Sequence, residues 1–320
     1  MVQESDTHPH LHLVGREPGP RVVAIGGGHG LAATLRAART YTDEITAVVS
    51  VADDGGSTGR LREAGESLAP GDLRKCLVAL ADPGSLLAKA MEFRFDAGEL
   101  KGHAVGNLML VAMKHATGDL VESLDEIGRL LEARGRVLPA TNEPVMLRAR
   151  RIGGGTVDGQ VCVNACDDLD LVEVDPPDAV ACPEAELAIL GAEQIVLGPG
   201  SLYTSVLAAA SVRGIREAIT RAEGQFVYVC NLNPQVAETA GYDVAAHVEA
   251  LHRHGLVPDV VLYDPERMSG AEGVPGVVPA QLAGPSGLAH DPHLLGRALA
   301  GLLGGRDGGL GGPAPGSPSP

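Results

Sequence analysis

The fold of this chain is decided by Arg21-Val-Val-Ala-Ile-Gly-Gly-Gly-His-Gly30 and the Leu31-Ala-Ala-Thr-Leu-Arg36 that follows it. The apolar run, with two valines and an isoleucine, predicts a buried strand. It leads through glycines into a helical pattern of apolar side chains. This arrangement aims backbone N–H groups at a phosphate, because glycines do not block the approach and a helix start carries partial positive charge.

The glycine turn matches the dinucleotide-binding fingerprint only in part, as Gly-x-Gly-x-Gly. We expect the backbone of this turn to bind the phosphates of a nucleotide, with a dinucleotide as one candidate ligand. The residues of the predicted turn are Gly26, Gly27, Gly28, His29 and Gly30.

A second β-branched strand, over residues 44–51, ends in an acidic and hydroxyl-rich turn. Asp53 follows Gly28 at close to the separation of about 20 residues at which dinucleotide folds place a ribose-binding acid. Carboxylates beside hydroxyls also suit Mg²⁺ next to a phosphate, whereas a simple turn is the structural alternative. We expect this turn to meet a ribose, or a metal beside a phosphate, through its carboxylates and hydroxyls. Its candidate residues are Asp53, Asp54, Gly55, Gly56, Ser57 and Thr58.

Charged and polar residues also begin two later helices. Asp72 follows Pro-Gly at a predicted helix start, where capping alone would explain it. Arg74 and Lys75 lie in the first turn, where the helix dipole disfavours cations, so we expect them to meet a phosphate. His103 and Asn107 begin the next buried helix, where a structural and a ligand-binding role are both open.

The pattern of strand, glycine turn and helix occurs again at Gln194-Ile-Val-Leu-Gly-Pro-Gly-Ser-Leu-Tyr-Thr204. Its glycines give access to the backbone, and its hydroxyls add a natural N-cap and hydrogen-bond donors. Asn231 ends the next strand, where an amide suits a base or sugar and equally suits a turn. The sequence therefore predicts a second anion site, with Gly198, Gly200, Ser201, Tyr203 and Asn231 as its candidate residues.

Alternating strands and helices predict a Rossmann-like α/β fold, with a mostly parallel, doubly wound sheet and helices on both faces. We expect a single domain over residues 21–303, with a β-rich insertion at about 137–180. The polar, proline-bearing residues 1–20 predict a disordered arm, and the Gly/Pro-rich residues 304–320 a disordered tail.

The bulk composition excludes some classes of function. The 25 basic and 41 acidic residues give a formal net charge of −16, which repels phosphate backbones, and 3 Phe, 5 Tyr and no Trp leave little surface for stacking bases. We therefore expect no nucleic-acid partner. The chain has no signal-peptide pattern and no apolar run of about 18 residues, so no membrane span is predicted. Five cysteines, an odd number, predict buried free thiols in a reducing cytoplasm.

Together these motifs resemble the YvcK-like gluconeogenesis factor family, which is related to CofD, the 2-phospho-L-lactate transferase. The resemblance spans about residues 21–303. Its motifs are the 22–35 turn unit, Asp53-Asp-Gly-Gly-Ser-Thr-Gly-Arg-Leu61, Pro70-Gly-Asp-Leu-Arg-Lys75, Gly102-His-Ala-Val-Gly-Asn-Leu108, Gly198-Pro-Gly-Ser-Leu-Tyr-Thr-Ser205 and His290-Asp-Pro292.

The resemblance implies a cytoplasmic protein that binds a UDP-sugar or a similar nucleotide and acts in cell shape and wall growth on gluconeogenic carbon sources. We also expect a homo-oligomer and protein partners in cell-wall synthesis. The CofD side of the resemblance implies a Mg²⁺ held by Asp53 and Asp72. The chain departs from the family pattern at Asn231-Leu-Asn-Pro-Gln-Val-Ala-Glu-Thr239, which lacks the usual glycine. It also has Ala289 where the family has an arginine before His-Asp-Pro.

Three functions stay open from the sequence. The first is a regulator that senses a nucleotide sugar, favoured because no convincing nucleophile–base pair is evident. The second is a Mg²⁺-dependent, CofD-like transferase that moves a phosphate-bearing group from a nucleotide donor. The third is an NAD dehydrogenase, for which His103 is the candidate proton relay.

Overall fold

The computed structural model describes residues 19–63, 69–235 and 237–304. The predicted arm at 1–20 and the predicted tail at 304–320 lie outside this range except at their inner ends. Gly19 and Gly304, the two outer described residues, line one shared surface pocket. The N-terminal and C-terminal ends of the domain are therefore neighbours.

The core of the domain is a sheet of seven parallel strands in the order β10-β9-β8-β7-β1-β2-β3. All its pairings are parallel, as in β1 with β2 and β1 with β7. The strands are β1 (Val22–Gly26), β2 (Ile45–Val49), β3 (Arg136–Pro139), β7 (Gln194–Leu197), β8 (Gln225–Val229), β9 (Val260–Tyr263) and β10 (Val277–Pro279).

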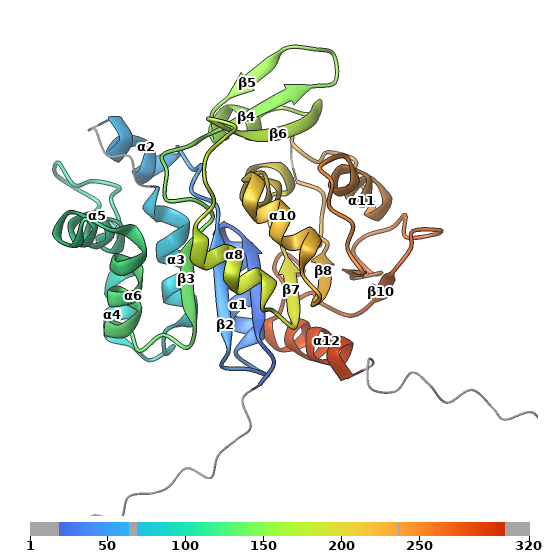
Figure 1. Ribbon diagram of the computed structural model, residues 1–320, viewed down its shortest axis with the longest axis horizontal. Helices are drawn as coiled ribbons and strands as arrows, with labels where there is room; N and C mark the ends of the chain where they lie inside the picture. Colours follow the sequence, from blue (N-terminus) through green and yellow to red (C-terminus); the bar gives the residue numbers. More distant parts are fainter. Residues whose placement is uncertain (1–18, 64–68, 236, 305–320) are drawn as a thin grey trace, which may run out of the picture.

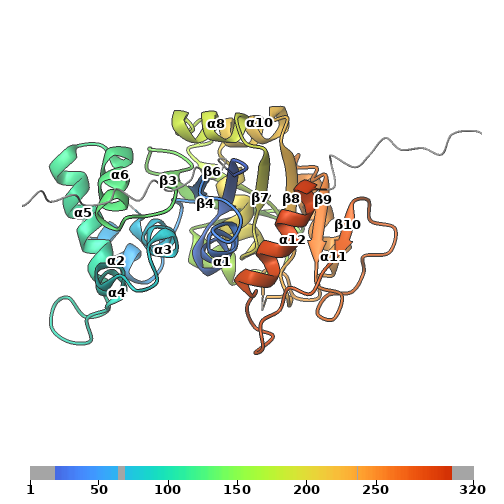
Figure 2. The same cartoon turned by 90° about the horizontal axis from the view of Figure 1, so that it is seen from below.

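Helices cover both faces of this sheet, which explains why all five residues of β1 are buried apolar or glycine residues. On one face lie α1 (Gly28–Ala38), α3 (Pro70–Leu80) and α12 (Pro292–Gly304), and on the other lie α8 (Pro183–Leu190) and α10 (Arg213–Arg221) (Figure 2). The predicted Rossmann-like, doubly wound α/β fold is confirmed.

The strand order reverses at β1. The chain moves from β1 to β2 and β3 on one side, and later returns to place β7 on the other side of β1. In open α/β sheets, ligands bind at the carboxyl ends of the strands where the order reverses. The two glycine turns that the sequence singles out follow β1 and β7, so both lie at this switch point.

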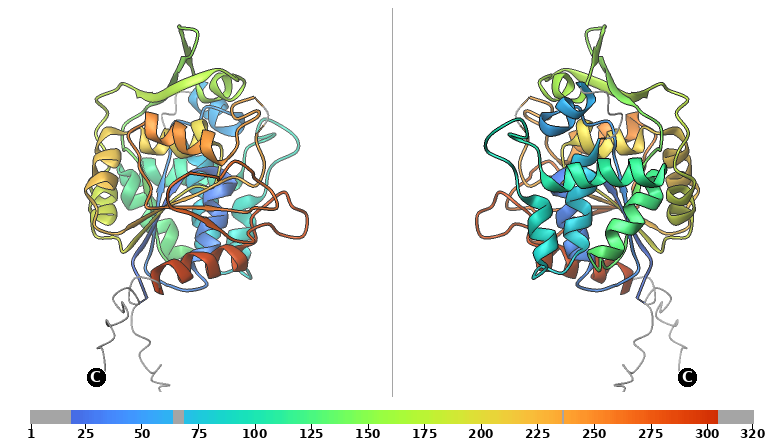
Figure 3. Two further views of the ribbon diagram at one scale, coloured as in Figure 1. Left: turned by 90° about the vertical axis from the view of Figure 1, so that its right-hand side faces the viewer. Right: turned by 90° about the vertical axis from the view of Figure 1, so that its left-hand side faces the viewer.

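The predicted β-rich insertion is a separate antiparallel sheet in the order β5-β4-β6. It lies across the end of the parallel sheet, at the top of Figures 1 and 3. The expected start at residue 137 is wrong, because residues 136–139 form β3 and pair with β2 in the main sheet. The insertion contains β4 (Met146–Arg151), β5 (Thr156–Asp158), α7 (Gln160–Asn164) and β6 (Leu169–Asp175).

The remaining helices complete the layers, and α4, α5 and α6 extend the domain beside β3 (Figure 1). Among the described residues, no helix is long and apolar enough to cross a membrane. All five cysteines are free, but the expectation that all are buried is wrong, since Cys162 is exposed and Cys166 is half-buried on and after α7. The helices that remain outside the layers described above are α2 (Gly56–Glu63), α4 (Leu86–Glu92), α5 (Val105–Thr117), α6 (Leu120–Leu130), the π-helix η1 (Leu202–Leu207), α9 (Ala208–Ala210) and α11 (Val244–Arg253).

Candidate functional site

The two glycine turns pack directly against each other. A Cβ atom added to Gly30 would lie 2.1 Å from the carbonyl oxygen of Pro199, which only glycine avoids. Gly28 has a φ of +63°, in the left-handed region that favours glycine. The Thr34 hydroxyl of α1 donates to the Gly198 carbonyl at 2.7 Å and ties the second turn to the first.

The amide of Asn231 positions the second turn. Its Oδ1 accepts from the Gly200 N–H at 3.0 Å, and its Nδ2 donates to the Gly200 carbonyl at 2.9 Å. Asn231 is also buried. The side chain that the sequence offers for a base or sugar is thus already paired with backbone on both atoms, and it shapes the cavity through Gly200.

A cavity of about 300 Å³ lies against the two turns. This volume is in the range of small-molecule sites. The N-cap residue of α1, Gly27, has no side chain to cap the helix, and no acidic residue occupies its first turn. The positive end of the helix dipole therefore faces this space and the nearby carboxylate of Asp72. We call this space the switch-point cavity; its walls include His29, Gly30, Ala33, Gly200, the 231–235 segment and residues 288–290.

The second predicted anion site already holds an anion of the chain itself. Glu238 is 1 % exposed and accepts the Thr204 hydroxyl at 2.9 Å. Burial raises the pKa of Glu238, while hydrogen bonds from Thr204 and from the backbone of Tyr203 and Leu202 lower it. The carboxylate therefore lies at the start of η1, where we predicted a ligand phosphate, whereas Gly200 and Asn231 of the same predicted site line the switch-point cavity.

Tyr203, which we predicted as a residue of the second anion site, has a structural role. Its side chain is fully buried, and its hydroxyl lies 3.0 Å from that of Tyr242 and donates to the Leu169 carbonyl at 3.3 Å. The ring joins the insertion to the core instead of facing the cavity. Ser201 stands at the expected N-cap position, but its hydroxyl makes no capping hydrogen bond.

The two predicted metal ligands, Asp53 and Asp72, lie near each other. A Cβ atom on Gly27 would lie 2.6 Å from Asp72 Oδ2, so this carboxylate lies over the first glycine turn. Burial, and then the charge of Asp72, raise the pKa of Asp53. Asp72 also pairs with Lys75 through Oδ1 and Nζ at 2.9 Å. Residues from the end of β2 and the start of α3 thus bring a carboxylate pair to the edge of the turn.

The neighbouring acid has a structural role. Asp54 accepts hydrogen bonds from the backbone N–H groups of Gln160 and Val161, both at 3.0 Å, at the start of α7. Gly55 donates its N–H to Asp53 at 3.1 Å, and Gly56 begins α2 with a φ of +49°. Asp54 therefore attaches the insertion to the end of β2 and does not point a free carboxylate at a ligand.

A third group of predicted residues lies where α2 meets α5. The Ser57 hydroxyl lies 3.1 Å from His103 Nδ1 and accepts from Asn107 Nδ2 at 3.0 Å. Burial, and then the charges of Arg60 and Arg94, lower the pKa of His103. The sequence does not predict this contact between Ser57 and His103. The Ser57 hydroxyl is buried and already has two hydrogen-bonding partners.

The two cations of α3 that we predicted to bind phosphate, Arg74 and Lys75, point to different neighbours. Arg74 is buried, and a Cβ atom on Gly106 would lie 2.8 Å from its Cγ and Cδ. Its Nε and Nη1 have no hydrogen-bond partner. Lys75 faces Asp72 beside the glycine turn, whereas Arg74 faces α5.

The Thr58 hydroxyl is buried beside Gly71 and lowers the pKa of Asp53 by a hydrogen bond.

Sequence reasoning missed several residues that build the site. Thr34 and Glu238 fix the second turn, and Ala33 lies on the cavity side of α1. His290 lines the cavity, with Nε2 3.1 Å from the Cys230 carbonyl, and burial lowers its pKa to about 4. All four lie in stretches that the sequence had singled out, residues 22–35, 231–239 and 290–292, but nothing in the sequence assigned them these roles.

Comparisons with known proteins agree with this architecture. The family model of the 2-phospho-L-lactate transferase CofD matches residues 22–272. The chain is 42 % identical over 247 residues to the gluconeogenesis factor of Halalkalibacterium halodurans, covering 76 % of this chain and 77 % of that protein. It is 40 % identical over 237 residues to the gluconeogenesis factor of Bacillus subtilis, covering 73 % and 75 %. A relative from Nostoc sp. is 45 % identical, but the chain spans only 52 % of its length.

A solved structure supports the same relationship. The crystal structure of a upf0052 family protein from Bacillus halodurans superposes with a TM-score of 0.83 at 36 % sequence identity, covering 89 % of this chain and 100 % of that one. Fold, motifs and identity over most of the chain therefore agree. The chain belongs to the CofD family and, within it, to the YvcK-like gluconeogenesis factors.

Proposed function

We propose that the chain is a cytoplasmic regulatory protein that binds a nucleotide sugar in the switch-point cavity. The observation that carries this proposal is the uncapped N-terminus of α1, which opens on a cavity built from both glycine turns. Backbone N–H groups at a helix start bind phosphate without needing net positive charge. This accounts for an anionic ligand in a chain whose formal net charge is −16.

The choice of a UDP-sugar rests on the family resemblance, and the geometry favours it over NAD. A dinucleotide would use the acid after the second strand on its ribose. Here Asp53 accepts the Gly55 N–H and lies next to Gly71 and Asp72, so its carboxylate is drawn toward α3. A ligand that binds without placing a ribose against this acid therefore fits better than NAD.

The carboxylate pair fits a magnesium ion beside the phosphates. Asp53 and Asp72 are hard-oxygen ligands of like charge. Burial, and then the charge of Asp72, raise the pKa of Asp53, and a bound cation would offset both effects. No cluster of three acidic, histidine or cysteine ligands occurs among the described residues, so phosphate oxygens and water would complete the shell. A bound Mg²⁺ would neutralise phosphate charge, while Lys75 keeps Asp72 turned toward Gly27.

Isothermal titration with UDP-glucose tests the proposal, using Ala33→Glu to place a negative charge in the cavity. Ala33→Gln is the matched control, because it adds almost the same volume without charge. We expect Ala33→Glu to bind at least about tenfold more weakly than Ala33→Gln, because like charges repel in a desolvated site. Equal affinities of the two variants, or tighter binding of NAD than of UDP-glucose by the unmodified chain, would contradict the proposal.

A second candidate function, a CofD-like transferase, is favoured by the carboxylate pair beside Gly27. In this case Mg²⁺ and the α1 amides would stabilise the charge of a phosphate-bearing group during transfer. A product assay with GDP-linked phospholactate, a deazaflavin acceptor and Mg²⁺ distinguishes the two. Turnover that is lost in Asp53→Asn would establish the transferase, and absence of product with intact Mg²⁺ binding would reject it.

The wider role follows from the family. We propose that nucleotide-sugar binding regulates protein partners in cell-wall synthesis, and so cell shape and growth on gluconeogenic carbon sources, with the chain acting as a homo-oligomer. Deletion and complementation test this role: restoration of shape on gluconeogenic carbon by the unmodified chain and not by Ala33→Glu would support it. Equal restoration by both would contradict it.

A further inference from the structure

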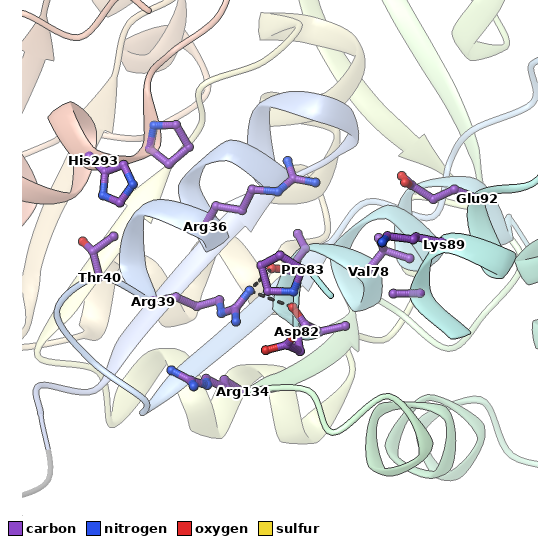
Figure 4. A pocket seen from close by; sticks show the side chains of 14 residues that line it. Arg36, Arg39, Thr40, Val78, Asp82, Pro83, Lys89, Glu92, Arg134 and His293 are labelled. Carbon is purple, nitrogen blue, oxygen red and sulfur yellow. Dashed lines mark hydrogen bonds between the residues drawn. The ribbon is translucent and has the colours of Figure 1, made fainter. Parts of the chain in front are cut away.

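A second cavity, of about 460 Å³, lies at the opposite end of α1 from the glycine turn. The last turn of α1 forms one wall with Arg36, Arg39 and Thr40, and the start of α12 adds His293. Figure 4 shows these side chains together with Pro83, from the segment between α3 and α4, and with Lys89 and Glu92 of α4. We call this space the basic cavity.

The basic cavity concentrates positive charge in a strongly acidic chain. Its lining holds four cationic side chains, of Arg36, Arg39, Lys89 and Arg134, against two carboxylates, of Asp82 and Glu92. The Asp82 carboxylate already accepts the N–H of Gly84 at 2.7 Å within its own turn. The net charge of the lining is therefore opposite in sign to that of the whole protein.

The chain itself leaves much of this charge unpaired. Within residues 19–63, 69–235 and 237–304, no hydrogen bond or ion pair engages the side chain of Arg36 or of Lys89. Arg134 reaches only Asp43, at 3.9 Å and with both side chains more than half exposed, a contact that contributes little. Three cations are thus available to a ligand.

Arg39 anchors the floor of the cavity. Its Nη1 donates to the carbonyls of Ala79 and Ala81, at 3.1 and 2.8 Å, where α3 ends (Figure 4). Its buried Nε has no hydrogen-bond partner among the described residues. Burial lowers the pKa of Arg39 most, and the charge of Arg134 lowers it further.

The remaining walls are apolar. Val78, Ala81, Pro83, Ala88 and Pro292 separate the cationic groups. Guanidinium groups suit the paired oxygens of a phosphate, while proline and alanine walls suit a carbon skeleton. A volume of this size holds a small metabolite but not a folded partner.

We propose that the basic cavity binds a small phosphorylated metabolite. Its anionic groups contact Arg36 and Lys89 on one side of the cavity and Arg134 on the other, and its carbon skeleton lies against Pro83 and Ala88 (Figure 4). This site is separate from the switch-point cavity, although α1 and the segment leading into α12 contribute to both. The proposal does not depend on the nature of the ligand at the glycine turns.

Titration calorimetry with inorganic pyrophosphate as the probe tests this site. The titrations use the full chain carrying Ala33→Glu, so that binding at the glycine turns does not contribute. We expect Arg36→Gln combined with Arg134→Gln to weaken pyrophosphate binding at least about tenfold, because two charge-assisted contacts are lost. Arg221→Gln, an exposed arginine on α10, removes the same kind of charge elsewhere and should change the affinity less than about twofold.

Several results would overturn the proposal. The first is the absence of pyrophosphate binding in the Ala33→Glu background. Equal weakening by Arg221→Gln would show that only net charge matters, and tighter binding of citrate than of pyrophosphate would show a carboxylate site instead. Because the substituted arginines are surface side chains outside the core, unchanged thermal unfolding of each variant verifies that the chain still folds.

Discussion

The two strand–glycine–helix turns have nearly the same sequence pattern and opposite outcomes. The turn after β1 leads into α1, whose N-cap Gly27 has no side chain and whose first turn lies on the switch-point cavity, while the nearby Asp72 carboxylate is paired with Lys75. The turn after β7 leads into η1, whose start is occupied by Glu238. A glycine-rich helix start thus predicts that an anion is needed, and it does not predict whether a ligand or the chain supplies it.

The largest expected effect comes from separating the two turns. Gly30→Ala would place a Cβ atom 2.1 Å from the Pro199 carbonyl oxygen, so the backbone must move. We expect a loss of about 3 kcal/mol in the free energy of unfolding, in the range of overpacking, together with loss of nucleotide binding. Urea denaturation measures the change in the free energy of unfolding. Gly153→Ala is the control, because its Cβ atom would meet nothing within 4 Å; equal stability of the two variants would refute the tight contact.

The next largest effect is at the occupied turn. Glu238→Ala removes the carboxylate from the start of η1 and leaves buried donors unpaired, so we expect the free energy of unfolding to fall by about 2–3 kcal/mol. Glu223→Ala, at an exposed position, should change it by less than about 0.5 kcal/mol. If Glu238→Ala unfolds like the unmodified chain, the carboxylate is not needed at η1, and the contrast between the two turns fails.

Sequence alone predicted the fold well and the site unevenly, for physical reasons. The buried β1 run and its glycines have a local cause, so the strand and the turn could be predicted, whereas the switch point follows only from the strand order. The role of Glu238 could not, because it depends on a carboxylate brought from 34 residues after Thr204 in the chain. The same holds for Asp54, whose carboxylate caps a helix more than 100 residues away, and for Tyr203, whose hydroxyl meets β6.

A substitution that should raise the affinity for UDP-glucose also tests the turn after β1. Ala289 lines the switch-point cavity at the position where the family pattern has an arginine. Ala289→Arg restores a cation there, and one charge-assisted hydrogen bond should tighten UDP-glucose binding about tenfold. Ala289→Gln has a long polar side chain without charge and should gain little. Equal affinity of these two variants in calorimetry would show that position 289 does not meet the phosphates.

The smallest expected effect concerns the carboxylate pair beside the open turn. Burial and Asp72 raise the pKa of Asp53, so its ionised form costs stability above that pKa and the protonated form does not. Asp53→Asn should therefore stabilise the Mg²⁺-free chain at pH 7 by about 1 kcal/mol. This gain should disappear as the pH falls below the ordinary carboxyl pKa. Thermal unfolding from pH 3 to 8 measures it, and a gain that does not vary with pH would contradict the assignment.

The most direct test of the contrast between the turns is a crystal structure of the chain with UDP-glucose and Mg²⁺ bound. The account predicts the diphosphate on the backbone N–H groups at Gly28–Gly30, the metal between Asp53 and Asp72, and Glu238 unmoved at η1. A diphosphate bound at the start of η1, with Glu238 displaced and α1 left uncapped, would contradict it.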